Sequence, residues 1–214
     1  MLLDLDGTLV NSVPDLTASL NRVLMPRGLA RFDEAEVTPF IGDGVPALVR
    51  RALRARGQAE SQDILDAFLA DYGANASVAT KPYPGVTEGL TTLRNQGWRL
   101  AVCTNKPEAP ARELLAALGL LPLLAAVGGG DSFPVRKPDP AHLLETLRVA
   151  GGEPAAAVSL GDHRNDVLAA QGAGVPCIFA GWGYGPRSMA EGAWAVAECF
   201  ADVPGLAGTL LTRL

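Results

Sequence analysis

The sequence predicts an α/β fold: a doubly wound, Rossmann-like parallel sheet core with an inserted all-helical cap domain. Three observations lead to this prediction. Short apolar runs without polar alternation recur along the chain, as expected for parallel strands that are buried on both faces. Helical patterns separate these runs, so strand and helix alternate. One long stretch near the N-terminus interrupts the alternation and contains helical patterns alone.

The first predicted strand carries an irregularity. The apolar runs that predict strands lie at residues 2–5, 100–103, 123–127, 156–160 and 175–180. Only three residues precede Asp4, whereas a strand usually has about five or six. We expect either that this strand is short or that the natural chain begins upstream of Met1.

The helical patterns divide the chain into two parts. After the first strand they lie at residues 13–27, 45–56 and 63–72, and later at 86–95, 107–118, 140–149 and 165–172. We therefore predict a Rossmann-like core made of residues 1–12 and 82–214, and a helical cap made of residues 13–81. Hinges are expected near 10–14 and 80–84, where prolines flank the connections. The alternative is a helical excursion that packs immovably on the sheet.

Composition limits the possible partners and location. The chain has 214 residues, of which 48% are apolar and 19% charged, so it can bury a sizeable core. A net charge of -5 argues against nucleic-acid binding, which favours a basic face. Cys103, Cys177 and Cys199 form no CxxC pair, as expected in a reducing cytoplasm. No leader segment and no run long enough to span a membrane is seen, so we expect a cytoplasmic protein without membrane partners.

The first acidic motif directly follows the first apolar run. Asp4 and Asp6 are two residues apart on extended backbone, so both carboxylates can face one site. Gly7 permits a sharp turn after them, and Thr8 follows. Ligands bind at the carboxyl ends of strands in such sheets. An Asp-x-Asp pair alone is weak evidence for a functional site, because acidic turns are common. At the end of the first predicted strand and followed by Gly and Thr, it is strong evidence.

Three further polar groups follow later apolar runs. Thr104 and Asn105 come after residues 100–103, Lys137 precedes a helix, and Asp162 and Asp166 follow residues 156–160. Each has a simpler interpretation: a helix cap, a solvated charge or an acidic helix start. Together they place carboxylates, a hydroxyl and a lysine at one sheet edge.

This set of groups is suited to phosphoryl transfer. A carboxylate can attack phosphorus and form a covalent intermediate. Such an attack on an anion needs charge compensation, which Mg²⁺ and a lysine supply. A second carboxylate can protonate the leaving oxygen and then activate water.

The four motifs resemble those of the haloacid dehalogenase superfamily in order and spacing. The resemblance implies that Asp4 is the nucleophile and a metal ligand, and that Asp6 is the general acid/base and gives its backbone carbonyl to Mg²⁺. It implies that Lys137 neutralises nucleophile and phosphate. It further implies phosphoryl binding by Thr104 and the Asn105 N–H, and metal ligation by Asp162 and Asp166.

Asp6 and the cap narrow the range of functions that this resemblance implies. Dehalogenases of the superfamily lack an acid at the position of Asp6, so the resemblance implies a phosphatase or a phosphomutase. The runs 11–16, 40–45, 103–107 and 161–170 look like those of phosphoglycolate phosphatases, which implies 2-phosphoglycolate as substrate. Asn11 and His163 depart from that subgroup, which usually has Asp and Ser there; a packing or capping role for His163 is the simpler interpretation. Alternatives are a sugar phosphate or pyrophosphate as substrate, or a β-phosphoglucomutase-like phosphomutase.

Substrate recognition is expected from the cap. The loop Gly42, Asp43 and Gly44 lies between cap helices, where it can close over the site and exclude water. Arg50 or Arg51 on the next helix are candidate partners for a small acid, although a solvated helix face explains them more simply. His142, within a helical pattern, is interpreted as structural.

Two non-enzymatic classes of protein share some of these features. A signalling receiver domain gathers similar groups, but it arranges its acidic pair, phosphorylated Asp, Thr and Lys in another order and lacks so large a helical insert. A catalytically silent binding module is the second alternative, although none of the four motifs is damaged. We expect a small phosphorylated metabolite as the only partner, and a monomer or homodimer.

Overall fold

The sheet has the predicted doubly wound arrangement. The computed structural model describes residues 1–211. Over these residues, the strands form one parallel sheet of six strands in the order β5-β4-β1-β6-β7-β8. The strands of this sheet are β1 Leu2–Leu3, β4 Ala101–Cys103, β5 Ala126–Gly128, β6 Ser159–Gly161, β7 Cys177–Ala180 and β8 Ala195–Ala197. The predicted α/β class is confirmed.

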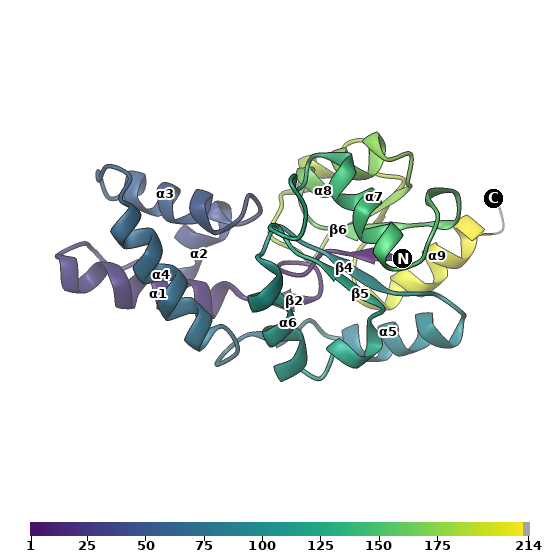
Figure 1. Cartoon of the computed structure of the whole chain (residues 1–214), viewed down its shortest axis with the longest axis horizontal. Coiled ribbons are helices and arrows are strands. Elements are labelled where there is room, and N and C mark those ends of the chain that lie inside the picture. Colours follow the sequence, from purple (N-terminus) through teal and green to yellow (C-terminus); the bar gives the residue numbers. More distant parts are fainter. Residues whose placement is uncertain (212–214) are drawn as a thin grey trace.

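Helices cover both faces of this sheet. The core helices are α5 Val86–Asn95, α6 Glu108–Ala117, α7 Pro140–Val149, α8 Arg164–Gly172 and α9 Val203–Leu211. Helices α7 and α8 lie on one face, and α5, α6 and α9 on the other (Figure 1). Alternate residues of each strand point to opposite faces, so Leu3 packs in the cluster under α5, and Leu2 packs with α7. Both faces are buried, which explains the unpatterned apolar runs.

The short first strand is held from both sides. Leu2 pairs with Ala101 of β4 and with Ser159 of β6. The Asp4 N–H then donates to the carbonyl of Leu160 at 2.9 Å. The backbone of Asp4 is therefore anchored to a neighbouring strand although β1 has only two residues.

A second group of helices forms a separate layer at one end of the molecule (Figure 1). It consists of α1 Val13–Leu24, α2 Glu34–Val37, α3 Val45–Ala55 and α4 Gln62–Asn75. Their apolar faces meet in a cluster of their own, which includes Leu20, Leu53 and Phe68. Short 3-10 turns lie at Met25–Arg27, Thr38–Phe40, Leu121–Leu123, Pro154–Ala156, Arg187–Ala190 and Phe200–Asp202.

The two connections to these helices pair with each other. Strand β2 Val10–Asn11 and strand β3 Lys81–Pro82 form an antiparallel ribbon, with Val10 opposite Pro82 and Asn11 opposite Lys81. The sequence predicts hinges here but not this pairing. Among residues 1–211, no helix is both long and apolar enough to cross a bilayer.

Candidate active site

Strand ends bring the candidate residues together. Asp4 follows β1, Thr104 follows β4, and Asp162 follows β6, at one edge of the parallel sheet. Lys137 lies between β5 and α7, and Asp166 lies in the first turn of α8. These five residues are adjacent in space because β1, β4, β5 and β6 are consecutive neighbours in the sheet.

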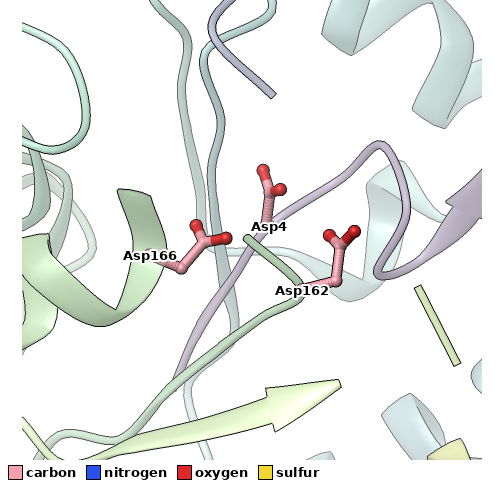
Figure 2. A group of neighbouring side chains, drawn as sticks. All are labelled: Asp4, Asp162 and Asp166. Atoms are coloured by element: carbon pink, nitrogen blue, oxygen red, sulfur yellow. The ribbon is translucent and has the colours of Figure 1, made fainter. Parts of the chain in front are cut away.

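Three carboxylates form a compact cluster. Asp4, Asp162 and Asp166 each place an oxygen within 4.8 Å of the others. Figure 2 shows the three side chains close together, Asp4 from the segment after β1, and Asp162 and Asp166 from the segment between β6 and the first turn of α8. Asp162 and Asp166 are buried, and Asp4 is nearly so. Clustered carboxylate oxygens are the hard ligands that Mg²⁺ prefers, so this donor set fits that ion.

Burial and mutual repulsion disfavour the charged forms of Asp4 and Asp162. Burial raises the pKa of Asp4 to about 6; Lys137 opposes this effect and Asp166 adds to it. Burial, followed by the charges of Asp4 and Asp166, raises the pKa of Asp162 to about 8. A bound cation reverses this repulsion, which is a second reason that the cluster suits a metal ion.

Lys137 connects two of the carboxylates. Its Nζ lies 2.8 Å from Asp4 Oδ1 and 2.5 Å from Asp166 Oδ1, and donates to the Cys103 carbonyl at 2.7 Å. Burial alone lowers the pKa of Lys137, but the two carboxylates raise it above its ordinary value. Lys137 therefore carries its charge next to the candidate nucleophile.

His142 fixes the backbone of Lys137. The Lys137 N–H donates to His142 Nδ1 at 3.2 Å, and the His142 Nε2 lies 3.0 Å from the Gly129 carbonyl. Since Nδ1 accepts, Nε2 carries the proton and donates to Gly129. Burial, followed by the charge of Lys137, lowers the pKa of His142 to about 4, so the ring is neutral at pH 7. This is the structural role expected of His142.

The loop after Asp6 supports Asp162. Thr8 Oγ1 and the Tyr184 N–H each donate to an Asp162 oxygen at 2.8 Å. Gly7 has a φ of +88°, and a Cβ there would lie 2.3 Å from Asp162 Oδ2. Only glycine allows this approach.

Asp6 lies outside the carboxylate cluster. Its side chain is 16% exposed, and both of its oxygens lie 3.4 Å from Lys106 Nζ. The structure thus gives Asp4 and Asp6 different cations. Asp6 as a metal ligand through its backbone carbonyl remains a prediction.

Thr104 and Asn105 occupy the end of β4. Thr104 is buried, its N–H donates to Gly128, and its Oγ1 accepts from the Lys106 N–H at 3.2 Å. The Asn105 Nδ2 donates to the carbonyls of Gly42 and Lys137, both at 3.0 Å. Asn105 therefore joins the loop of Lys137 to the loop at residues 42–44.

The loop at residues 42–44 lies on the core. Asn165 Nδ2 donates to Asp43 Oδ1 at 2.7 Å and to the Gly42 carbonyl at 3.3 Å. A Cβ on Gly42, whose φ is +119°, would lie 2.6 Å from the His163 ring. His163 itself caps α8, because its Nδ1 accepts from the Asn165 N–H at 3.2 Å.

The two candidate arginines point to protein groups instead. Arg51 pairs with Asp43 and donates to the Phe40 carbonyl. Arg50 faces Glu60 at 3.9 Å. Neither arginine is among the described residues that line the cavity, so the structure does not support them as direct partners of an acidic substrate.

A cavity lies between the cluster and the helices of residues 13–75. Its lining from the core is mostly polar: Asp4, Asp6, Thr104, Asn105, Lys106, Lys137, His163, Asn165 and Asp166. Its lining from the other layer is mostly apolar: Leu16, Ile41, Gly42, Gly44, Val45 and Leu48. Asp43 is absent from this lining, so it acts on the loop through Asn165 and Arg51.

Sequence reasoning missed several residues of this site. Lys106 stands two positions after Thr104 within a recognised run, and that proximity is the signal that could have found it. Asn165 lies inside the last motif. Thr8 likewise lies inside the first motif. Tyr184 and Tyr72 give no such signal, because their contacts depend on how distant segments pack.

Comparisons with known proteins agree with this geometry. Residues 1–180 match the family model of haloacid dehalogenase-like hydrolases. A phosphoglycolate phosphatase of Mesorhizobium japonicum is 41% identical over 89% of this chain and 86% of its own length. One of Rhodospirillum rubrum is 42% identical over 95% and 88%. The crystal structure of a predicted phosphoglycolate phosphatase from Haemophilus somnus superposes with a TM-score of 0.87, at 34% identity over 96% of each chain.

Proposed function

Because the chain belongs to the haloacid dehalogenase-like hydrolases and is a phosphoric monoester hydrolase, we propose that it hydrolyses 2-phosphoglycolate through an aspartyl-phosphate on Asp4. The observation that carries this proposal is the position of Asp4. It stands at the end of a central strand, in contact with Lys137 and beside Asp162 and Asp166. The relatives named phosphoglycolate phosphatase support the choice of substrate.

The proposed reaction has two steps. An Asp4 carboxylate oxygen attacks phosphorus, the P–O ester bond breaks, and its electron pair goes to the leaving oxygen, which takes a proton from Asp6. Water then attacks the phosphorus of the aspartyl-phosphate and gives a proton to Asp6, and the electron pair of the acyl phosphate bond returns to Asp4. The products are glycolate and inorganic phosphate.

The surrounding groups hold the phosphoryl oxygens and limit water. Lys137 balances the charge of Asp4 and of the phosphoryl group, and Thr104 donates its hydroxyl hydrogen to a phosphoryl oxygen. Asp4, Asp162, Asp166 and the Asp6 carbonyl would hold Mg²⁺, which supplies positive charge to the phosphoryl group. The loop at residues 42–44 covers the site and excludes bulk water.

The proposal extends to the organisation of the chain. We take residues 13–81 as a cap on a core of residues 1–12 and 82–214, because α1–α4 have their own apolar cluster and because α1, α3 and the loop between α2 and α3 line the cavity. The apolar cap wall and small cavity favour a compact substrate. The free thiols of Cys103 and Cys177 agree with a cytoplasmic location.

Phosphate release tests the proposal. We would measure kcat/KM for 2-phosphoglycolate, several sugar phosphates, pyrophosphate and an aryl phosphate, each with Mg²⁺ and with EDTA. The expected result is release that needs Mg²⁺ and a preference for 2-phosphoglycolate of about tenfold or more, roughly 1.4 kcal/mol in the transition state. A sugar phosphate isomerised without phosphate release would indicate a mutase. No release from any compound would overturn the proposal.

A further inference from the structure

Lys106 carries a buried charge that the proposed reaction leaves without a role. The chain has three lysines: Lys81, Lys106 and Lys137. Lys137 serves the carboxylate cluster and Lys81 is exposed. The side chain of Lys106 is only 3% exposed, although it belongs to the loop after β4 that lines the cavity. A buried ammonium is costly unless its surroundings compensate it, so its partners show what it does.

One partner of Lys106 is the carboxylate of Asp6. Its Nζ lies 3.4 Å from both Oδ1 and Oδ2 of Asp6. The equal distances place the ammonium opposite the middle of the carboxylate instead of on one oxygen. The contact therefore orients the carboxylate while leaving both oxygens available for proton transfer. The pKa of Lys106 is raised in spite of its burial, with Asp6 and Tyr72 as the causes, so it stays charged.

The other partner comes from a different layer of the molecule. Lys106 Nζ donates to Tyr72 Oη at 2.6 Å, and it lies 4.3 Å from the centroid of the Tyr72 ring. Tyr72 is on α4, which packs against α1 and α3. Its ring is stacked on Phe68 at a centroid distance of 5.6 Å, and both rings are buried. Tyr72 thus has a fixed place within its own layer and reaches Lys106 only through its hydroxyl and ring face.

We propose that Lys106 is a positioning residue for Asp6, and that Tyr72 holds Lys106 there only while α4 is seated on the core. The geometry of proton transfer to the leaving oxygen is thereby tied to the position of the helical layer. This inference rests on the proposed function, in which Asp6 protonates the leaving oxygen. It adds that Lys106 from the core and Tyr72 from the helical layer together position Asp6 for proton transfer.

The substrate's leaving group reports on this step. When the P–O bond of 2-phosphoglycolate breaks, the electron pair goes to an alkyl oxygen, which needs the proton of Asp6. p-Nitrophenolate stabilises the same electron pair without a proton, so p-nitrophenyl phosphate depends little on Asp6. A misplaced Asp6 must therefore lower kcat/KM, which reports the steps up to departure of the leaving group, for the first substrate and spare it for the second. A general structural defect lowers kcat/KM for both. Hydrolysis of the aspartyl-phosphate also uses Asp6, but it is common to both substrates and affects kcat instead.

The primary experiment compares Lys106→Met with the wild type on these two substrates, in the full-length protein with Mg²⁺. Methionine keeps the length and the apolar stem while removing the charge. Since general acid catalysis contributes about 10²- to 10⁴-fold, we expect kcat/KM for 2-phosphoglycolate to fall roughly 10- to 100-fold and that for p-nitrophenyl phosphate to fall less than about threefold. Lys81→Met is the matched control, because it removes an exposed lysine, and both values should stay at wild-type level.

Tyr72→Phe separates the two parts of the proposal. It deletes one hydroxyl and keeps the stacked ring, so the protein folds. We expect the same selective loss for 2-phosphoglycolate, smaller than that of Lys106→Met. In the double variant the loss should equal that of Lys106→Met alone, because Tyr72 acts through Lys106. Should Lys106→Met fail to fold, the ratio of the two substrates in Tyr72→Phe still decides the matter.

Three outcomes would overturn the inference. Equal losses on both substrates would assign Lys106 a structural or general electrostatic role. A loss on 2-phosphoglycolate that is absent on 2-hydroxyethyl phosphate, an alkyl phosphate without a carboxylate, would mean that Lys106 binds the substrate's carboxylate. Additive losses in the double variant would separate Tyr72 from Lys106. A wild type that releases phosphate from neither substrate would instead refute the proposed function itself.

Discussion

Asp4 and Asp6 are two residues apart, yet they have separate electrostatic surroundings. Asp4 is in contact with Lys137 and within the carboxylate cluster. Asp6 lies outside that cluster, beside Lys106. A nucleophile must stay ionised, whereas an acid/base group must exchange a proton. One lysine for each carboxylate allows the two proposed roles, nucleophile for Asp4 and acid/base for Asp6, to be set independently.

Substitution of Asp4, the proposed nucleophile, gives the first residue-scale prediction. In Asp4→Asn, turnover of 2-phosphoglycolate and of an aryl phosphate should fall at least about 10³-fold, because an amide does not attack phosphorus. The fold should survive: removing one of three repelling carboxylates should leave the Tm of the metal-free protein equal or higher. Phosphate release and thermal melts measure both effects, with the exposed Asp63→Asn as control. Appreciable hydrolysis by Asp4→Asn would refute the covalent mechanism.

The residues that the sequence could identify share one property. Asp4, Thr104 and Asp162 directly follow buried strands, and Asp166 lies in the first turn of the helix after β6. A parallel sheet aligns the carboxyl ends of its strands. Their meeting point thus follows from local patterns alone. Tyr72 and Lys106 touch across two layers whose packing no local pattern specifies. Arg51 was a reasonable partner for an acid, but its pairing with Asp43 also depends on that packing.

At the scale of elements, the N-terminus of α8 serves both the fold and the site. His163 and Asp166 form a reciprocal cap: the His163 ring accepts from Asn165, and Asp166 Oδ2 accepts from the His163 N–H at 3.0 Å. The same turn presents Asn165 to the loop at residues 42–44. A change in that loop is therefore felt next to the carboxylate cluster.

A substitution at Gly42 tests the contact between the loop at residues 42–44 and His163. In Gly42→Ala the new methyl group meets the His163 ring and the backbone keeps an unfavourable positive φ, so the loop should lift from the core. We expect kcat/KM for 2-phosphoglycolate to fall about tenfold or more. Gly57→Ala is the matched control, because Gly57 also has a positive φ but nothing within 4 Å of its Cβ position. It should lose roughly 1 kcal/mol of stability and no activity.

A second variant makes the cause specific. Adding His163→Ser to Gly42→Ala removes the ring that the methyl group meets, so part of the lost kcat/KM should return. No recovery would mean that the backbone strain of residue 42, and not its contact with His163, sets the loop's position.

The elements differ in how well sequence predicts them. Helices α5 and α7 begin and end at the predicted residues, because ten-residue patterns with 3.6 periodicity are specific. Strands of two to four residues carry too little pattern, so their ends are shifted by up to three positions. Strand β8, made of Ala195–Ala197, was missed because alanine does not favour strands. The β2–β3 pair was missed since it joins residues some seventy positions apart.

At the scale of the whole molecule, the carboxylate cluster affects global stability. Asp4 and Asp162 have a higher pKa in the folded protein than an ordinary carboxyl group near about 4. As pH rises, the unfolded chain loses these protons first, while the folded chain keeps them until the raised values of about 6 and about 8 are reached. The metal-free protein should therefore lose stability as pH rises from about 4 to about 8.

Magnesium should cancel this loss. The ion binds ionised carboxylates, so binding releases protons and becomes tighter as pH rises. We expect saturating Mg²⁺ to raise the Tm by several degrees more at a pH of about 8 than at about 5.5, roughly 2–4 °C per kcal/mol for a chain of this size. Thermal melts with Mg²⁺ and with EDTA at both pH values measure this. An equal Mg²⁺ effect at both values would show that Asp4 and Asp162 do not lose protons on binding.

The pairing of β2 with β3 has a consequence for how such an enzyme can change over evolutionary time. Val10 faces Pro82 and Asn11 faces Lys81, so the chain leaves the core and returns to it at one point. A segment inserted between Asn11 and Lys81 therefore leaves the path of the sheet unaltered. Closing a long insert costs little more entropy than closing a short one. If the proposed function holds, helices inserted at this ribbon can therefore be replaced, and substrate selectivity changed with them, without altering the chemistry proposed for Asp4.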